Sequence, residues 1–329
     1  HGSEREALSL DMSRRLRVRV LDAANHPVLA ARVRLSGDGM NFTALTHADG
    51  GFDFYPNVHA SRFAGRATLD VEVETLRASA TVDVPASGDS QELTVRLPAV
   101  VAPPPPTLDL AFAIDVTGSM GDELRYVNRE VANIVHRITQ EAPGTNVRVG
   151  ATFYRDRYDD AVVQMIPFTS NVAGFATAMQ GVTASGGGDY PEDMNAGLEN
   201  AMTRLNWSEG AAVRVLVVIA DAPPQNYPDA QFTYRTAITD AARRGIRLLP
   251  VGASGANRTV EYLFRAMGAA TSTPYVYLTD DSGVGGAHME ADTDRVAVER
   301  FNDLLTRLVV SDLRGQGMHE PGALASPRS

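Results

Sequence analysis

Oxygen-bearing side chains follow an apolar run near the middle of this 329-residue chain. Residues 108–114 read LDLAFAI, and the segment DVTGSM that follows places Asp115, Thr117 and Ser119 at every second position. One carboxylate and two hydroxyl groups, without nitrogen or sulfur, are ligands that suit Mg²⁺, Ca²⁺ or Mn²⁺. Because the same residue types also cap helix N-termini, a tight polar turn at the start of a helix is the competing interpretation.

Carboxylates stand in two further segments that could reach the same place. Asp221 begins the segment DAPPQ directly after the apolar run at 213–220, and Glu192 lies in SGGGDYPED, ahead of a predicted helix. Three carboxylates packed together without an ion would repel one another and resist ionisation. A divalent cation removes that cost, so the three segments together favour a metal site. The candidate oxygen donors named by this pattern are Asp115, Thr117, Ser119 and Asp221, with further carboxylates in SGGGDYPED.

The elements that must position these residues alternate from residue 108 onward between apolar runs and segments of helical period. Strands buried on both faces and joined by helices form a doubly wound, mostly parallel α/β sheet of Rossmann-like type. Ligands of such sheets gather at the carboxyl ends of the strands. The predicted strands are 108–114, 147–154, 161–168, 213–220, 246–252 and 274–279. The predicted helices are 121–141, 171–181, 191–206, 229–244, 257–269 and 292–310.

The part of the chain before this α/β domain shows a different pattern. Short segments between residues 15 and 98 alternate apolar and polar side chains at period two and are separated by turns such as ADGG and ASGD. This pattern predicts a small antiparallel β-sandwich. The segment AVVAPPPPT at 99–107 predicts a stiff linker. We therefore divide the chain into a tag remnant and leader (1–14), a β-sandwich (15–98), a linker (99–107), an α/β domain (108–312) and a disordered tail (313–329).

The composition excludes several function classes. A formal net charge of −10 disfavours nucleic acid or an anionic membrane surface as a partner. Cysteine is absent, which excludes thiolate metal sites and cysteine nucleophiles, and every basic residue is Arg, which excludes Schiff-base chemistry. The chain has no run of about 18 apolar residues, so we expect no membrane insertion. The sequence predicts no oligomeric state.

The segments DVTGSM and IADAPP resemble the von Willebrand factor A domain and its metal-ion-dependent adhesion site over about residues 108–310. The resemblance places Asp115, Thr117, Ser119 and Asp221 at the metal-ligand positions of that family. It implies a Mg²⁺ ion, or Ca²⁺ or Mn²⁺, with one open coordination position. A partner protein would fill this position with the carboxylate of an Asp or Glu side chain.

The second loop departs from the usual family pattern. Its segment DYPE resembles the integrin β-subunit version, which implies that Glu192 binds the same metal and that Asp189 helps to hold a neighbouring cation. The segment SMGDE resembles the integrin stretch that holds a third ion, which implies accessory roles for Asp122 and Glu123. A turn at Asp189 and first-turn helix positions for the three other acidic residues are the alternatives. GGGDYPE with FYRDR also resembles bacterial A domains related to those beside alpha-kinases, although no kinase signature is present.

The predicted β-sandwich at 15–98 also resembles a known family. The segment VRVLDAANHPVLAARVRLSG resembles carboxypeptidase-regulatory or transthyretin-like sandwiches, which implies an accessory module of an exported, extracytoplasmic protein. We expect a non-enzymatic protein-binding module that uses the metal to ligate a partner's carboxylate. The alternatives are an assembly component with a vestigial metal site, and a Mg²⁺- or Mn²⁺-dependent hydrolase with Asp156 or Glu192 as the base. Arg155 and Asp156 fit either the rim of the site or a surface ion pair.

Overall fold

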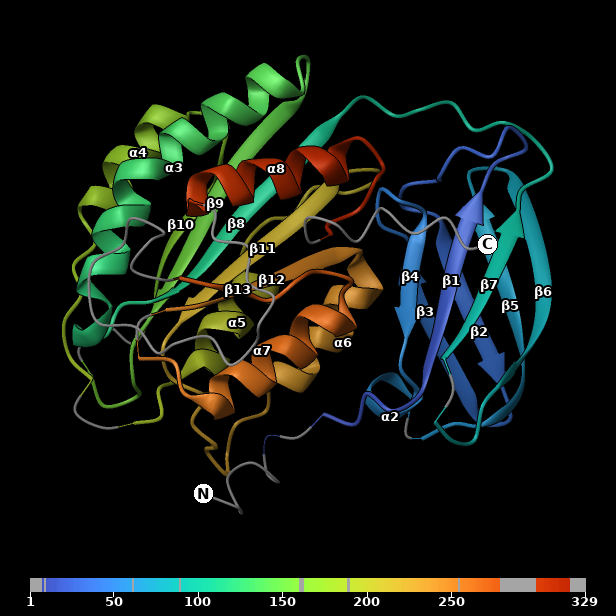
Figure 1. Ribbon diagram of the computed structural model, residues 1–329, viewed down its shortest axis with the longest axis horizontal. Helices are drawn as coiled ribbons and strands as arrows, with labels where there is room; N and C mark the ends of the chain where they lie inside the picture. Colours follow the sequence, from blue (N-terminus) through green and yellow to red (C-terminus); the bar gives the residue numbers. More distant parts are fainter. Residues whose placement is uncertain are drawn as a thin grey trace.

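A computed structural model describes the chain in two parts, which form three β-sheets (Figure 1). The described residues are 8, 10–60, 62–88, 90–159, 163–187, 190–253, 255–278 and 300–319. The first part contains a three-stranded and a four-stranded sheet, and the second contains a six-stranded sheet covered by helices. The predicted fold class, a mostly parallel α/β sheet preceded by a smaller all-β part, is confirmed.

The two N-terminal sheets pack around one apolar core, which includes Phe42, Phe52 and Phe54. Strands β1 (Arg15–Leu21), β4 (Gly51–Phe54) and β7 (Ser90–Arg96) form one sheet in the order β4-β1-β7. Strands β2 (Arg32–Gly37), β3 (Met40–Leu45), β5 (Gly65–Val73) and β6 (Leu76–Val84) form the other in the order β3-β2-β5-β6. The prediction of a purely antiparallel sandwich is wrong at one place, because β1 and β7 are parallel. Strand β7 joins β1 after the chain crosses over from the other sheet, and not through a hairpin.

The six-stranded sheet has the order β10-β9-β8-β11-β12-β13. Its strands are β8 (Thr107–Asp115), β9 (Asn146–Tyr154), β10 (Val163–Thr169), β11 (Val213–Ala220), β12 (Ile246–Gly252) and β13 (Val276–Tyr277). All neighbours are parallel except β9 and β10, which are antiparallel. The chain leaves the central strand β8 toward β9 and returns to its other side as β11. This change of direction lies between β8 and β11, where α/β sheets bind their ligands.

Helices cover both faces of this sheet (Figure 1). The helices are α3 (Gly121–Glu141), α4 (Val172–Gln180), α5 (Met194–Thr203), α6 (Tyr234–Arg244), α7 (Arg258–Ala270) and α8 (Phe301–Leu313). Helices α3, α4 and α8 pack in one apolar cluster, and α5, α6 and α7 pack in another. Helix α5 begins after Asp193, which caps it by accepting a hydrogen bond from the Ala196 N–H, and not at the predicted Pro191. The predicted helix at 292–310 has its first residues, 292–299, outside the described ones, and α8 continues to Leu313.

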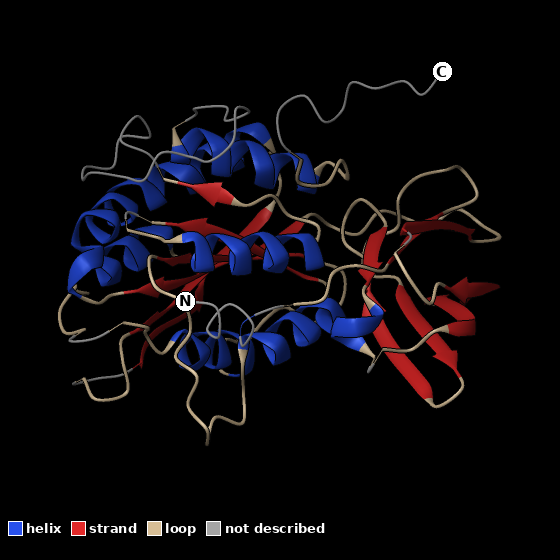
Figure 2. Ribbon diagram, turned by 60° about the horizontal axis from the view of Figure 1, so that its bottom comes forward, coloured by secondary structure: helices blue, strands red, loops and turns tan. Residues whose placement is uncertain are grey.

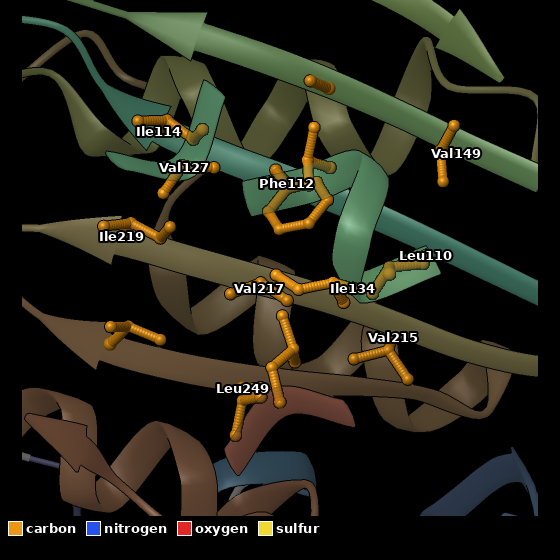
Figure 3. Packing of buried hydrophobic residues seen from close by; sticks show 14 of the residues in the cluster. Leu110, Phe112, Ile114, Val127, Ile134, Val149, Val215, Val217, Ile219 and Leu249 are labelled. Atoms are coloured by element: carbon orange, nitrogen blue, oxygen red, sulfur yellow. The ribbon is translucent and has the colours of Figure 1, made fainter. Parts of the chain in front are cut away.

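Alternation along the central strands builds the core beneath α3. Phe112 and Ile114 of β8 and Val217 of β11 lie on one face of the sheet and contact side chains such as Val127 and Ile134 of α3 (Figure 3). These side chains are 0% exposed. Each fully buried aliphatic or aromatic side chain stabilises the fold by roughly 1.5–3 kcal/mol, so the core fixes the two strands that precede the candidate site.

The sandwich packs directly against the α/β domain (Figures 1 and 2). Arg247 of β12 is 0% exposed, and its guanidinium lies between Asp49 of the sandwich and Asp312 of α8. Leu45 of β3 lies close to Gly245, where an added Cβ would be 3.1 Å from the Leu45 Cβ. The proline-rich segment therefore joins two parts that share a buried boundary.

Both ends of the described chain also contact the α/β domain. Leu8 and Leu10 are buried in the cluster with α5, α6 and α7, and the Tyr262 hydroxyl donates to the Leu10 carbonyl at 3.3 Å. Met318 is 2% exposed in the cluster with α8, so packed structure continues beyond the predicted boundary at residue 312. Among the described residues, no helix is both long enough and apolar enough to span a membrane.

Candidate metal centre

The register of the central sheet brings the first and third predicted loops together. Ile114 of β8 lies opposite Ile219 of β11, and both strands end within two residues of that pair. Asp115 is the last residue of β8, and Asp221 follows the last residue of β11. Because the two strands are parallel neighbours, both carboxylates emerge at the same edge of the sheet.

The turn after β8 is organised by Asp115. Its Oδ1 accepts hydrogen bonds from the Thr117 N–H at 2.9 Å and from the Thr117 hydroxyl at 2.7 Å. The Thr117 hydroxyl lies 3.4 Å from the Ser119 hydroxyl, and the short 3-10 turn η1 (Gly118–Met120) then leads into α3. Asp115 thus forms the tight polar turn of the competing interpretation through its Oδ1, whereas neither Thr117, the N-cap of η1, nor Met120, the N-cap of α3, makes a side-chain capping bond.

Asp221 completes the pairing of the first and third loops. It is 8% exposed, and burial raises the pKa of its carboxyl group. A hydrogen bond with the Ser119 side chain acts in the opposite direction, which places Ser119 beside this carboxylate. The structure thus brings Asp115, Thr117, Ser119 and Asp221 into one cluster.

Glu192 reaches the cluster from the second loop. Its backbone N–H donates to the Pro223 carbonyl at 3.2 Å, and its carbonyl accepts from the Gln225 N–H at 2.7 Å. These bonds fix Glu192 beside the segment that follows β11. The side chain is 4% exposed, and burial followed by the charges of Asp115 and Asp156 raises the pKa of Glu192 to about 8.

A glycine in the same loop lies between two of the predicted ligands. Gly187 has φ +73°, and a Cβ added to it would lie 2.8 Å from both Thr117 Cβ and Glu192 Oε1. The preceding residue, Gly186, accepts a hydrogen bond from the Gly118 N–H at 3.0 Å. The second loop can approach the turn after β8 this closely only because these positions carry no side chain.

Two buried carboxylate oxygens in the cluster have no hydrogen-bond partner among the residues that the structure describes. They are Asp115 Oδ2 and Glu192 Oε2. Burial and then the charge of Asp221 raise the pKa of Asp115 to about 7. Leaving a buried acceptor unsatisfied is costly, and a hard cation satisfies such oxygens while removing the repulsion between the carboxylates. The donors therefore fit Mg²⁺, Mn²⁺ or Ca²⁺, with the Thr117 and Ser119 hydroxyls as neutral ligands.

The hydroxyl groups are essential to this fit. Within the part of the chain that the structure describes, no group of three or more Asp, Glu, His or Cys side chains could hold a metal ion. Asp115, Glu192 and Asp221 thus do not form such a group by themselves, and a site at this edge would need the Thr117 and Ser119 hydroxyls as well.

The three accessory residues fall in different places. Glu123 is 1% exposed, and its charge raises the pKa of Asp221, so it lies within reach of the cluster. Asp122 points outward and forms an ion pair with Arg125 on the same helix. Asp189 lies outside the described residues. The helix-start interpretation thus suits Asp122 better than Glu123.

The structure adds residues that the sequence did not single out. The Tyr227 hydroxyl donates to Asp156 Oδ1 at 2.5 Å, and the Arg157 guanidinium lies 3.7 Å from the centre of the Tyr227 ring. Asp159 Oδ2 accepts from the Gly187 N–H at 2.9 Å and so ties the loop after β9 to the second loop. The run of alternating charges in YRDRYDD is the sequence signal that could have marked this loop.

The interpretation of Arg155 and Asp156 as a surface ion pair is wrong. Arg155 is 5% exposed and donates to the Ser185 carbonyl at 2.9 Å and the Thr183 carbonyl at 2.7 Å. Asp156 is 3% exposed and accepts from Tyr227. Both residues instead support the loops around the cluster.

Comparison with known protein families assigns the α/β domain. A model described as von Willebrand factor A domain matches residues 109–286, which is more than half of the chain. The chain belongs to the von Willebrand factor A family. Domains of this family generally mediate protein–protein interaction, and the sheet order and loop positions described above agree with this assignment.

Individual relatives of this A domain are distant. An ariadne-like RING finger protein of Acanthamoeba polyphaga mimivirus is 25% identical over 210 residues, which cover 62% of this chain and 20% of that protein. The alpha-protein kinase vwkA of Dictyostelium discoideum is 26% identical over 118 residues, covering 35% of this chain and 18% of the kinase. The chain therefore spans about a fifth of the length of the curated relatives that it matches.

A solved structure shows a weaker likeness. The conserved hypothetical protein BatB from Bacteroides thetaiotaomicron superposes with a TM-score of 0.42 at 13% identity, covering 64% of this chain and 98% of that one. The family assignment rests on the family model, and the resemblance of the N-terminal sandwich to carboxypeptidase-regulatory domains stays a prediction.

Proposed function

We propose that this A domain binds a divalent cation through Asp115, Thr117, Ser119, Glu192 and Asp221 and uses it to ligate the carboxylate of a partner protein. The observation that carries the proposal is the pair of buried carboxylate oxygens without hydrogen-bond partners, Asp115 Oδ2 and Glu192 Oε2. They lie in a cluster whose remaining donors are the Thr117 and Ser119 hydroxyls and the Asp221 carboxylate, at the edge of the sheet where ligands bind.

Hydrogen bonds within the cluster orient the proposed ligands. Asp115 holds the Thr117 hydroxyl through its Oδ1, and Ser119 pairs with Asp221, so each hydroxyl is oriented by a carboxylate. Arg155 supports the second loop through two carbonyl groups and lowers the pKa of Asp115 by its charge. When bound, the cation supplies a positive charge that attracts and orients an incoming carboxylate.

We assign no turnover to the site. Of the two bases in the hydrolase alternative, Glu192 is assigned here as a metal ligand, and Asp156 accepts a 2.5 Å hydrogen bond from Tyr227 and is 3% exposed, so its Oδ1 is already engaged. A binding role needs only the ligands and an accessible edge. We place the protein outside the cytoplasm on the resemblance of the sandwich to accessory modules of exported proteins.

Calorimetry tests the metal site directly. Titration of Mg²⁺, Mn²⁺ and Ca²⁺ into the chelator-treated protein should give saturable binding that Asp115→Asn and Thr117→Ala abolish. Asp240→Asn, which removes one half-buried carboxylate from α6, is the control and should bind as the parent does. Equal binding by the parent, Asp115→Asn and Thr117→Ala would overturn the proposal.

A further inference from the structure

Two tyrosine side chains are exposed on the loops that border the candidate metal centre. Tyr158 is 86% exposed and Tyr190 is 50% exposed. Tyr158 lies in the loop after β9, two residues beyond Asp156, and Tyr190 lies two residues before Glu192. Most other large apolar and aromatic side chains that the structure describes are buried or half-buried, so two such residues beside one site form a distinct feature.

Hydrogen bonds hold the two loops together around the site. Asp159 Oδ2 accepts from the Asp156 N–H at 3.2 Å and from the Gly187 N–H at 2.9 Å. Gly187 in turn lies against Thr117 and Glu192. Tyr158 directly precedes Asp159, which is bonded to Gly187, and Tyr190 stands two positions before Glu192, so both tyrosines are carried by segments that contribute to the cluster.

A cationic side chain of the protein itself lies in the loop that carries Tyr158. The Arg157 guanidinium lies 3.7 Å from the centre of the Tyr227 ring, and its Nη1 donates to Asp229 Oδ1 at 2.7 Å. Tyr227 and Asp229 are therefore engaged with Arg157. What Tyr158 and Tyr190 present to a partner is aromatic surface.

We propose, resting on the function proposed above, that the partner's carboxylate residue stands directly beside a large aromatic or aliphatic residue. This neighbour packs on the rings of Tyr158 and Tyr190 while the carboxylate reaches the metal. Tyrosine is enriched at protein interfaces because its ring offers a large contact area at low conformational cost, and aromatic pairs add attraction beyond the area they bury.

Short peptides test the proposal on the full chain. The probes are acetyl-Gly-Asp-Phe-Gly-amide, two peptides with Gly or Arg in place of Phe, and one with Asn in place of Asp. Calorimetry or NMR titration in Mg²⁺ should show that the Phe peptide binds about three- to tenfold more tightly than the Gly peptide. Tyr158→Ala and Tyr190→Ala should reduce this ratio toward one. Tyr262→Ala, which removes a 46% exposed tyrosine from α7, is the matched control and should keep it.

The outcomes separate this inference from the proposed function. Mg²⁺-dependent binding of the Asp peptides with equal affinity for the Phe and Gly versions would overturn the inference and leave the proposed function standing. Tighter binding of the Arg peptide than of the Phe peptide would overturn it in favour of a cationic neighbour. Equal behaviour of the Asp and Asn peptides, or binding that persists in EDTA, would overturn both.

Discussion

The guanidinium of Arg247 joins the two parts of the molecule, because its Nη2 lies 3.1 Å from Asp49 Oδ1 in the sandwich while its Nε lies 2.9 Å from Asp312 Oδ2 in α8. The Arg247 side chain is 1% exposed, and those of Asp49 and Asp312 are 8% and 2% exposed. A charge buried this deeply is tolerated only with its partners in place. The sandwich is therefore bound to the α/β domain through the buried ion pair of Asp49 with Arg247, and separating the two parts would break this pair.

Removing the sandwich carboxylate should destabilise the whole chain. Asp49→Asn leaves Arg247 with one carboxylate, and we expect the free energy of unfolding to fall by about 3–5 kcal/mol. Urea denaturation followed by circular dichroism measures the loss. Asp83→Asn removes an exposed partner of Arg66 in the same sandwich and should leave the stability almost unchanged. Equal losses for the two variants would contradict the assigned role of the buried network.

The contribution of Asp49 should disappear in acid. Burial raises the pKa of Asp49, but the charges of Arg247, His47 and Arg17 and a hydrogen bond from the Gly51 N–H together outweigh it and lower the pKa to about 2. Because the folded pKa is below the ordinary value of 3.8, Asp49 stabilises the fold above about pH 4 and loses this effect as the pH falls toward 2. The difference in unfolding free energy between the parent and Asp49→Asn should thus be constant from pH 5 to 7 and shrink below about pH 4. A difference that grows in acid would contradict this sign.

The Asp115 carboxylate, unlike that of Asp49, should destabilise the metal-free fold although it is proposed to bind the metal. Burial and the charge of Asp221 raise the pKa of Asp115 to about 7, so its charged form destabilises the metal-free fold at pH 7 and above. In EDTA, the free energy of unfolding of Asp115→Asn should exceed that of the parent by on the order of 1–3 kcal/mol. In excess Mg²⁺ the parent should gain stability, by about 2.7 kcal/mol at a hundredfold excess over Kd, and the variant should gain none.

Thermal denaturation in EDTA and in Mg²⁺ checks both halves of this prediction. Asp240→Asn on α6 is the control and should behave as the parent in both conditions. If Asp115→Asn destabilised the protein in EDTA, the Asp115 carboxylate would stabilise the metal-free fold, and the prediction would be wrong.

The convergence of Asp115 and Asp221 was predictable because it depends only on local pattern and topology. The apolar runs at 108–114 and 213–220 identify two buried strands, and parallel neighbours end at the same edge. Helix α3 occupies the predicted range of 121–141 because its apolar residues recur at helical spacing.

Contacts between distant segments could not be predicted in the same way. Arg247 lies in the segment IRLLPVG, and a charge inside a buried strand signals that a partner exists, but Asp49 stands 198 positions away. Tyr227 and Arg157 meet from two loops of irregular conformation, where no repeating pattern fixes a side chain. The parallel pairing of β1 with β7 likewise depends on how the two sandwich sheets meet, since period-two alternation is the same in either strand direction.

The close approach of Gly187 to the metal ligands gives the sharpest test of the site. Gly187 has φ +73°, and a Cβ there would lie 2.8 Å from both Thr117 Cβ and Glu192 Oε1, so Gly187→Ala should push the two ligands apart and weaken Mg²⁺ binding at least tenfold. Gly210→Ala is the matched control, because Gly210 has φ +76° with no atom within 4 Å of the added Cβ and shares only the backbone strain. Both variants should lose about 1 kcal/mol of stability from that strain. Calorimetric titration should show weaker Mg²⁺ binding for Gly187→Ala only. An equal fall in Mg²⁺ affinity in both variants would contradict the prediction. It would mean that Gly187→Ala acts through backbone strain and not through the contact with Thr117 and Glu192.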